Sequence, residues 1–390
     1  MYLREIKFCR NKGLPNEWQI EGRPHNGVFG QWLSFPEMTL IVGKNASGKS
    51  KTLDVIRNIA DLFAGDNHLS RLHAAGEGTA EYQLRFDDNG SLIEYYLNFE
   101  NGKILQETLT INAAEKLNRA AGKLWYEGVN KMLDFETDDD VLAISKRDKK
   151  QHSFFEALYA WGKHLSHYRF GTQLGKNALL RDMSAVRDDD EVDLKDSDQV
   201  ASIFIKGRRL FSDAFTAAVL ADMNAIAYDL KAIHVGPLKN FPVQGFGLHV
   251  QEGDLHDVTD QREMSQGMFR ALSLLVQLNY SLLSKTPSCI LIDDIGEGLD
   301  YDRSNSLIEL IIGKVQGSAV QVIMTTNDRF VMNKVPLAYW SVIQRVGNKS
   351  IFFNHKNSQQ TFDEFAYSGL SNFDFLKTEF YISGYEKEDD

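Results

Sequence analysis

The stretch Gly43-Lys44-Asn45-Ala46-Ser47-Gly48-Lys49-Ser50 decides the fold, because it contains every residue of a Walker A phosphate-binding loop. Residues 37–42 before it predict a buried strand, and an apolar stripe at helical spacing follows it. In that setting the glycines let the backbone form a nest of N–H donors around phosphates at a helix N-terminus. Lys49 can reach the β- and γ-phosphates, and Ser50 can ligate Mg²⁺. The sequence therefore predicts a nucleoside triphosphate with Mg²⁺, bound by this loop and the adjoining Lys51.

A second motif of phosphate chemistry follows far downstream, at Cys289-Ile290-Leu291-Ile292-Asp293-Asp294. Four apolar residues bury a strand, and two carboxylates stand at its carboxyl end, where α/β sheets bind their ligands. This is the form of a Walker B strand, in which we expect Asp293 to hold Mg²⁺ and Asp294 to orient or deprotonate the attacking water. Apolar strands that end in acids are common, so this interpretation depends on the Walker A loop in the same chain.

A partial motif, Met264-Ser265-Gln266-Gly267-Met268, precedes an apolar helix that leads to the Walker B strand. Alone, it is equally consistent with a simple helix N-cap by Ser265. Two further segments come after the Walker B acids: Gly298-Leu299-Asp300, and a predicted strand over residues 320–326 that ends at Asn327. The order of these segments, rather than any one of them, carries the interpretation.

This order resembles the ABC-class P-loop ATPases, in particular the SMC and overcoming-lysogenization-defect (OLD) groups. The family signature reads Leu-Ser-Gly-Gly-Gln, which Ser265 and Gly267 match, whereas the third and fifth positions depart from it. Asp300 falls in the D-loop, and Asn327 stands where the family usually has the switch histidine. The resemblance implies an α/β ABC-type ATPase head that binds ATP between two copies of the chain, in a homodimer or a higher assembly. Ser265 and Gly267 of one copy would close on the γ-phosphate held by the loop of the other.

Two departures from the family pattern concern turnover. Asp294 stands where the family has glutamate, and a carboxylate one methylene shorter holds the water less well. Asn327 cannot take up a proton as histidine can, although its amide can still donate a hydrogen bond to the γ-phosphate. With Lys49, these are the predicted catalytic residues. The hypothesis is slow hydrolysis by a switch that dwells in the ATP-bound dimer.

The rest of the chain is expected to divide into four parts. Residues 1–112 form the first part of the ATPase domain, with an antiparallel meander over residues 79–111 broken at turn signals. Residues 113–230 are predicted to be an inserted, mostly helical lobe with acidic loops at 137–140 and 187–191. The second part of the ATPase domain and a tail complete the division, at residues 231–345 and 346–390. The tail has aromatic residues suited to core packing or to docking: Phe373, Phe375 and Phe380.

Composition limits the classes of function. The formal charge of −11 and the pI near 5.5 do not favour nucleic acid as a partner, although short basic runs at 146–150 and 206–209 leave a local site open. No apolar run is long enough for a membrane crossing, and the first residues do not form a signal peptide. Cys9 and Cys289 support neither a disulfide framework nor a zinc site, which fits a cytoplasmic protein.

By the resemblance, the leading expectation is a standalone ATPase that gates a separately encoded effector, a nuclease or toxin, in bacterial phage defence. A nucleotide-locked scaffold with little hydrolysis is the structural alternative. DNA repair or maintenance of the SMC type is a further alternative, but the insert is short and lacks heptads. The transporter class fits the inserted lobe poorly. A GTPase is disfavoured because Asn333-Lys334-Val335-Pro336 lacks the aspartate of the guanine-reading motif.

Overall fold

The computed structural model describes residues 1–72, 78–181, 192–238 and 245–384. The predicted acidic loop at 187–191 lies outside these residues. The chain forms two compact units: the P-loop unit, Met1–Leu165 with Pro336–Asp390, and the signature unit, Ser166–Val335. The four-part division predicted from the sequence stays a prediction.

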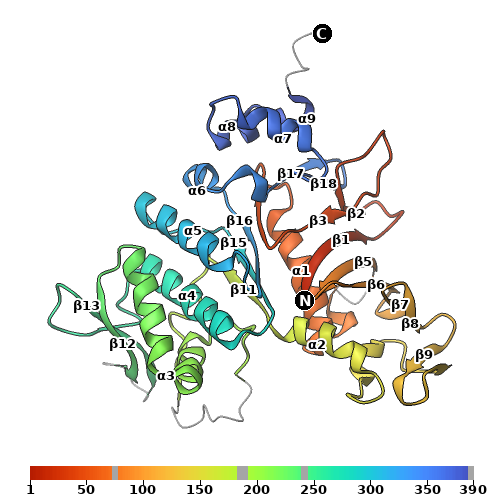
Figure 1. Cartoon of the computed structure of the whole chain (residues 1–390), viewed down its shortest axis with the longest axis horizontal. Helices are drawn as coiled ribbons and strands as arrows, with labels where there is room; N and C mark the ends of the chain where they lie inside the picture. The colour runs from red at the N-terminus through yellow and green to blue at the C-terminus, as the bar shows by residue number, and fades with distance from the viewer. Residues whose placement is uncertain (73–77, 182–191, 239–244, 385–390) are drawn as a thin grey trace. The chain divides into compact units, whose positions relative to one another are not determined.

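The P-loop unit is built on one mixed sheet (Figure 1). Its strands lie in the order β10, β9, β8, β7, β6, β5, β1, β2, β18, β17, β4, with β3 beside β1. The bounds are β1 (Tyr2–Arg10), β2 (Trp18–Gly22), β3 (Leu33–Ser34), β4 (Met38–Val42), β5 (Thr79–Asp88), β6 (Ser91–Glu100), β7 (Lys103–Ile111), β8 (Ala114–Asn118), β9 (Lys123–Tyr126), β10 (Lys131–Asp134), β17 (Trp340–Val346) and β18 (Lys349–Asn354). Strand β4 pairs in parallel with β17, so a strand from late in the sequence flanks the one that leads to the phosphate loop.

Aromatic packing joins the helices of this unit to the meander. Helix α1 (Lys49–Ala64) contributes Phe63, whose ring lies 4.8 Å from that of Tyr95 on β6. Helix α2 (Glu156–Lys163) contributes Trp161, whose ring lies 4.9 Å from that of Phe86 on β5. All four side chains are almost fully buried. One face of the meander therefore carries the core on which the phosphate-loop helix is fixed.

The meander is longer than the sequence indicates. The pattern predicts its end at Ile111, but β8, β9 and β10 continue it to Asp134, within the segment expected to be mostly helical. These strands are short, and their buried apolar side chains are Leu117 on β8 and Leu124 on β9. With so few apolar positions, the alternation of buried and exposed residues is too brief to detect in the sequence.

A buried carboxylate ties the meander to the chain that follows it. Glu107 on β7 is fully buried and accepts hydrogen bonds from the Tyr95 hydroxyl (2.8 Å), the Ala143 N–H (3.0 Å) and Arg119 (3.2 Å). Burial raises the pKa of Glu107, and these donors oppose that shift.

Replacing Glu107 with alanine should cost about 3–5 kcal/mol of unfolding free energy, because it leaves a largely buried guanidinium and two buried donors without their acceptor. Denaturant unfolding measures this. Glu115→Ala, on the exposed part of β8, is the matched control and should change stability by no more than about 0.5 kcal/mol. Equal midpoints for the two variants would contradict the structural role of Glu107.

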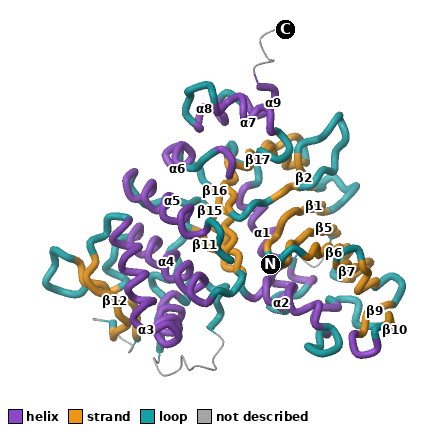
Figure 2. Tube along the Cα trace, viewed as in Figure 1, coloured by secondary structure: helices purple, strands orange, loops and turns teal. Residues whose placement is uncertain are grey.

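The signature unit combines parallel strands with long helices, shown in orange and purple in Figure 2. Strands β15 (Ser288–Asp293) and β16 (Val320–Thr325) pair in parallel, and β11 (Leu165–Arg169) lies next to β15. The helices are α3 (Val200–Ala225), α4 (Gln266–Ser284), α5 (Tyr301–Val315) and α6 (Arg329–Lys334). A small antiparallel sheet contains β12 (Leu230–Pro237), β13 (Phe246–Glu252) and β14 (Thr259–Asp260). The predicted class, mixed α/β with an antiparallel meander and a helical insertion, is confirmed.

The aromatic tail packs inward. Helices α7 (Gln359–Ala366), α8 (Asn372–Lys377) and α9 (Phe380–Ser383) belong to the P-loop unit. Phe375 is fully buried, with its ring 4.7 Å from that of Phe362, and Phe380 packs on Phe365. The structure therefore confirms core packing for Phe375, while Phe373 and Phe380 are half-buried. In the described part of the chain, no helix has both the length and the apolar character that crossing a membrane requires.

Candidate nucleotide-binding site

The phosphate loop begins directly after the buried strand β4 and ends where α1 starts. Gly48 at the helix N-cap has φ = 111° and Ala46 has φ = 62°, so the backbone turns through left-handed positions. Gly43 is required by packing, because a Cβ there would lie 2.5 Å from the carbonyl oxygen of Ile343. Such a turn before a helix N-terminus is the backbone arrangement that binds phosphate oxygens.

Lys49 is held against this loop. Its side chain is largely buried, and its ammonium donates to the carbonyl oxygen of Gly43 at 2.8 Å and to that of Lys44 at 3.4 Å. The Lys49 ammonium thus lies over the loop. Its two acceptors are neutral carbonyl oxygens, which a phosphate oxygen can replace. Ser50 is exposed in the first turn of α1, where a hydroxyl can ligate a cation carried by the phosphates.

Two residues that the sequence did not indicate brace the loop. The Ser350 hydroxyl on β18 donates to the carbonyl oxygen of Ser47 at 3.0 Å, and Trp18 Nε1 on β2 donates to the Ser350 hydroxyl at 3.1 Å. Lys51 Nζ lies 5.6 Å from the centre of the Trp18 ring. No local pattern could have indicated the two hydrogen bonds, since each joins residues more than 300 positions apart.

A cavity of about 400 Å³ lies beside the first turns of α1. Its lining includes Trp18, Lys51, Asp54 and Asn58. This combination of an aromatic surface with hydrogen-bonding side chains suits the nucleoside part of a ligand whose phosphates lie in the loop.

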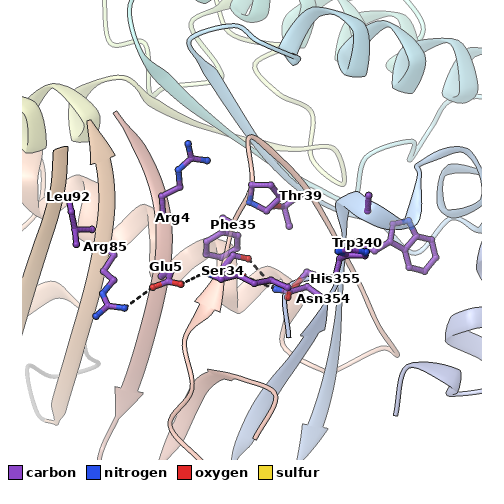
Figure 3. A pocket seen from close by; sticks show the side chains of 14 residues that line it. Arg4, Glu5, Ser34, Phe35, Thr39, Arg85, Leu92, Trp340, Asn354 and His355 are labelled. Atoms are coloured by element: carbon purple, nitrogen blue, oxygen red, sulfur yellow. Dashed lines mark hydrogen bonds and ion pairs between the residues drawn. The ribbon is translucent and has the colours of Figure 1, made fainter. Parts of the chain in front are cut away.

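A larger cavity, of about 570 Å³, lies elsewhere in the P-loop unit (Figure 3). It is lined by Thr39 near the start of β4, with ion-paired Arg85 and Glu5 at one side. Thr39 and Gly43 are four strand residues apart, which is about 13 Å. Size alone would therefore select the wrong end of β4, and the loop geometry identifies the phosphate site.

In the signature unit, Thr325 binds the carboxylate of one Walker B acid and the backbone of the other. Its hydroxyl donates to Asp293 Oδ1 at 2.7 Å and accepts from the backbone N–H of Asp294 at 2.9 Å. Asp294 has φ = 61°, a left-handed conformation that is costly for this residue type and typical of functional sites. Thr325 was not among the residues predicted from the sequence, although a polar residue at the end of the buried strand β16 could have indicated it.

Asn327 is bound to the carboxylate of Asp294. Its backbone N–H and its side-chain Nδ2 both donate to Asp294 Oδ1, at 3.1 and 3.2 Å. The structure therefore brings together the predicted base and the residue at the switch position. Because both bonds use the same oxygen, Oδ2 can accept from a water molecule.

The signature segment and the D-loop form one packed element. Ser265 caps α4 by accepting from the N–H of Met268 at 3.1 Å, which is the N-cap alternative considered from the sequence. Gly267 lies so close to the D-loop that an added Cβ would be 2.4 Å from the carbonyl oxygen of Gly298. Asp300 caps α5 by accepting from the N–H of Arg303 at 2.9 Å.

Replacing Gly267 with alanine should lower the unfolding free energy by about 1–3 kcal/mol, because the methyl group meets backbone that cannot rotate away. Gly313→Ala in α5 is the matched control, since a Cβ there meets no heavy atom within 4 Å. That variant should gain about 0.5–1 kcal/mol from helix propensity. Denaturant unfolding of both variants provides the test, and a gain in both would contradict the close approach at Gly267.

The residues at the two motifs fit a nucleotide-bound Mg²⁺ better than a protein-only metal centre. The described residues contain no group of three or more His, Cys, Asp or Glu side chains placed for a metal ion. Mg²⁺ is typically held by one or two carboxylates with water and phosphate oxygens. Ser50 in the P-loop unit and Asp293 in the signature unit each offer an oxygen ligand of that kind.

Comparison with known proteins supports the class of fold and activity. A family model described as "AAA domain, putative AbiEii toxin, Type IV TA system" matches residues 38–333. An SMC head bound to the C-winged helix domain of ScpA is similar in structure, with a TM-score of 0.54 at 14% identity over 90% of this chain and 97% of that one. An SMC head with an extended coiled coil, from a complex with ScpA derived from Pyrococcus furiosus, has a TM-score of 0.52 at 13% identity, covering 94% and 99%. No curated protein sequence gives a match.

Proposed function

Because the chain belongs to the AAA-domain family described as putative AbiEii toxin, Type IV TA system, and is an ATPase of ABC/SMC-like type, we propose that two copies close around ATP as a slow switch. The observation that carries the proposal is the phosphate loop at the N-terminus of α1, in which the Lys49 ammonium donates to the carbonyl oxygen of Gly43. In this proposal the loop of one copy holds the triphosphate, Lys51 and Trp18 lie beside the nucleoside, and Asp300 borders the signature segment.

The second copy would supply the start of α4. The N-terminus of this helix carries a partial positive charge and backbone donors suited to a γ-phosphate. Ser265 and Gly267 lie there, packed on the D-loop. Closure of this element on the phosphate would make ATP part of the interface between the copies.

Hydrolysis would depend on the residues at the end of β15. Mg²⁺, held by Ser50 and Asp293, would supply charge neutralisation at the phosphates. Asp294 would orient the attacking water through its carboxylate, and Asn327 would hold that carboxylate in place. Slow turnover follows from the short aspartate side chain and from an amide that cannot exchange a proton.

The proposed role of the switch is to gate a separate effector in the cytoplasm. One support is the family description, which names a putative toxin of a Type IV TA system. The other is that the motifs described above all concern ATP, so the effector's own chemistry would come from another protein. A nuclease or toxin encoded separately is the partner that fits this context, in phage defence. SMC-like DNA maintenance is the alternative that the fold leaves open.

A nucleotide-locked scaffold is the second candidate function. Asp294 and Asn327 favour it, because the aspartate is one methylene shorter than the glutamate usual in the family and the amide cannot take up a proton. In that case ATP would hold the assembly together without being consumed.

The test is to mix the purified protein with Mg²⁺ and ATP and to follow phosphate release in a single turnover, with mass measured by light scattering. Slow release accompanied by transient dimers supports the switch. A stable ATP-bound assembly without release supports the scaffold. Fast steady-state turnover, or no ATP-dependent change in mass, would contradict the switch.

A further inference from the structure

The C-terminal segment reaches the phosphate loop. Glu379, at the start of α9, forms an ion pair with Lys44 in the loop, with 2.5 Å between Oε1 and Nζ. The side chain of Glu379 is 31% exposed and that of Lys44 is 73% exposed. The family match ends at residue 333, so this contact comes from a part of the chain beyond it.

Packing fixes the position of the Glu379 carboxylate. Tyr381, two residues on, is buried with its ring 5.1 Å from that of Phe353 on β18. Arg23 donates to the carbonyl oxygen of Ile382 at 3.0 Å. Glu379 itself has φ = 57°, an uncommon conformation for a residue other than glycine, which the surrounding contacts maintain. The packing of the residues that follow Glu379 therefore holds its carboxylate beside the loop.

Lys44 is connected to Lys49 through the backbone. The carbonyl oxygen of Lys44 accepts from the N–H of Ser47 at 3.2 Å and from Lys49 Nζ at 3.4 Å. A change in the position of Lys44 thus alters both the loop and an acceptor of the Lys49 ammonium. Glu379 acts on the loop from outside, through its ion pair with the Lys44 side chain.

We propose that Glu379 is a positioning residue of the nucleotide site that competes with the phosphates of ATP for Lys44. This rests on the proposed function, since it requires ATP in the loop. The triphosphate and the Glu379 carboxylate carry charge of the same sign, so the Lys44 ammonium cannot serve both fully. An exposed ion pair is weak, which sets the expected effect on ATP affinity at about two- to fivefold.

Binding and release are reciprocal. If the ion pair between Glu379 and Lys44 weakens ATP binding, then bound ATP must weaken that ion pair by the same factor. Amide hydrogen exchange over residues 372–384 should therefore become faster when Mg²⁺ and ATP are added. The C-terminal segment would thus report on the nucleotide state of the loop.

A double-mutant cycle on the full chain tests the proposal, with a fluorescent ATP analogue and Mg²⁺ as the probe. Glu379→Gln should tighten binding about two- to fivefold and change its salt dependence. The same substitution should have no effect in a Lys44→Met background. Glu364→Gln is the matched control, because it removes one charge from α7, where Glu364 accepts from Gln360.

Three results would overturn the proposal: unchanged binding by Glu379→Gln, weaker binding by that variant, or an equal gain in the Lys44→Met background. Thermal unfolding of each variant shows that the comparison is made between folded proteins. Failure of the one premise taken from the proposed function, ATP in the loop, is distinguishable, because the wild-type chain would then not bind the analogue at all.

Discussion

Replacing Lys49 with alanine should abolish ATP binding, hydrolysis and any ATP-dependent assembly, with a loss of affinity of about a hundredfold or more. The Lys49 ammonium is largely buried over the loop, where its attraction to phosphate is screened less than at an exposed site. Alanine removes the charge and leaves the backbone donors of the loop. Titration with a fluorescent ATP analogue gives the affinity, and phosphate release gives the activity.

Lys103→Ala is the matched control for this prediction. Lys103 is an exposed lysine at the start of β7 in the same unit, and its loss should leave both ATP binding and stability unchanged. The stability of Lys49→Ala should also remain close to that of the wild type, because its hydrogen bonds are to loop carbonyls. Wild-type affinity in a folded Lys49→Ala variant would remove the basis of the proposed function.

Asp294→Asn should lower the rate of hydrolysis by about a hundredfold or more while ATP binding persists. The amide has nearly the same shape, and its oxygen can still accept from Asn327, but it cannot take a proton from water. The ATP-bound dimer should therefore accumulate. Single-turnover phosphate release combined with light scattering measures the two effects separately.

The control here is Asp254→Asn, which removes a carboxylate from the exposed turn between β13 and β14. It should leave the rate and the assembly as in the wild type. If Asp294→Asn hydrolyses ATP at the wild-type rate, Asp294 is not the residue that activates water. If the wild-type chain also fails to hydrolyse ATP, the scaffold is the better description.

The sequence predicts those parts of the site that are contiguous. The phosphate loop lies within residues 43–50, and both Walker B acids adjoin one apolar strand, so spacing alone indicates their chemistry. The cap by Ser265 is likewise local. The roles of these residues in binding and catalysis stay predictions, although the elements that carry them are confirmed.

The contacts that the sequence could not indicate join distant parts of the chain. Ser350 and Trp18 brace the loop from two different strands, and neither has a motif around it. The hydrogen bonds between Asn327 and Asp294 depend on the pairing of β15 with β16, which is set by the fold. Strands β8 to β10 were missed for a local reason, since they are too short for a pattern to be recognised.

The position of Ser350 in the chain also has a consequence for synthesis. Ser350 follows Ser47 by 303 residues, and β17, the parallel neighbour of β4, is likewise made late. At ribosomal rates of about 5–20 residues per second, roughly 15–60 s separate the loop from the strand and the hydroxyl that shape it. Throughout that interval a nascent chain carries the phosphate-loop sequence without its braces.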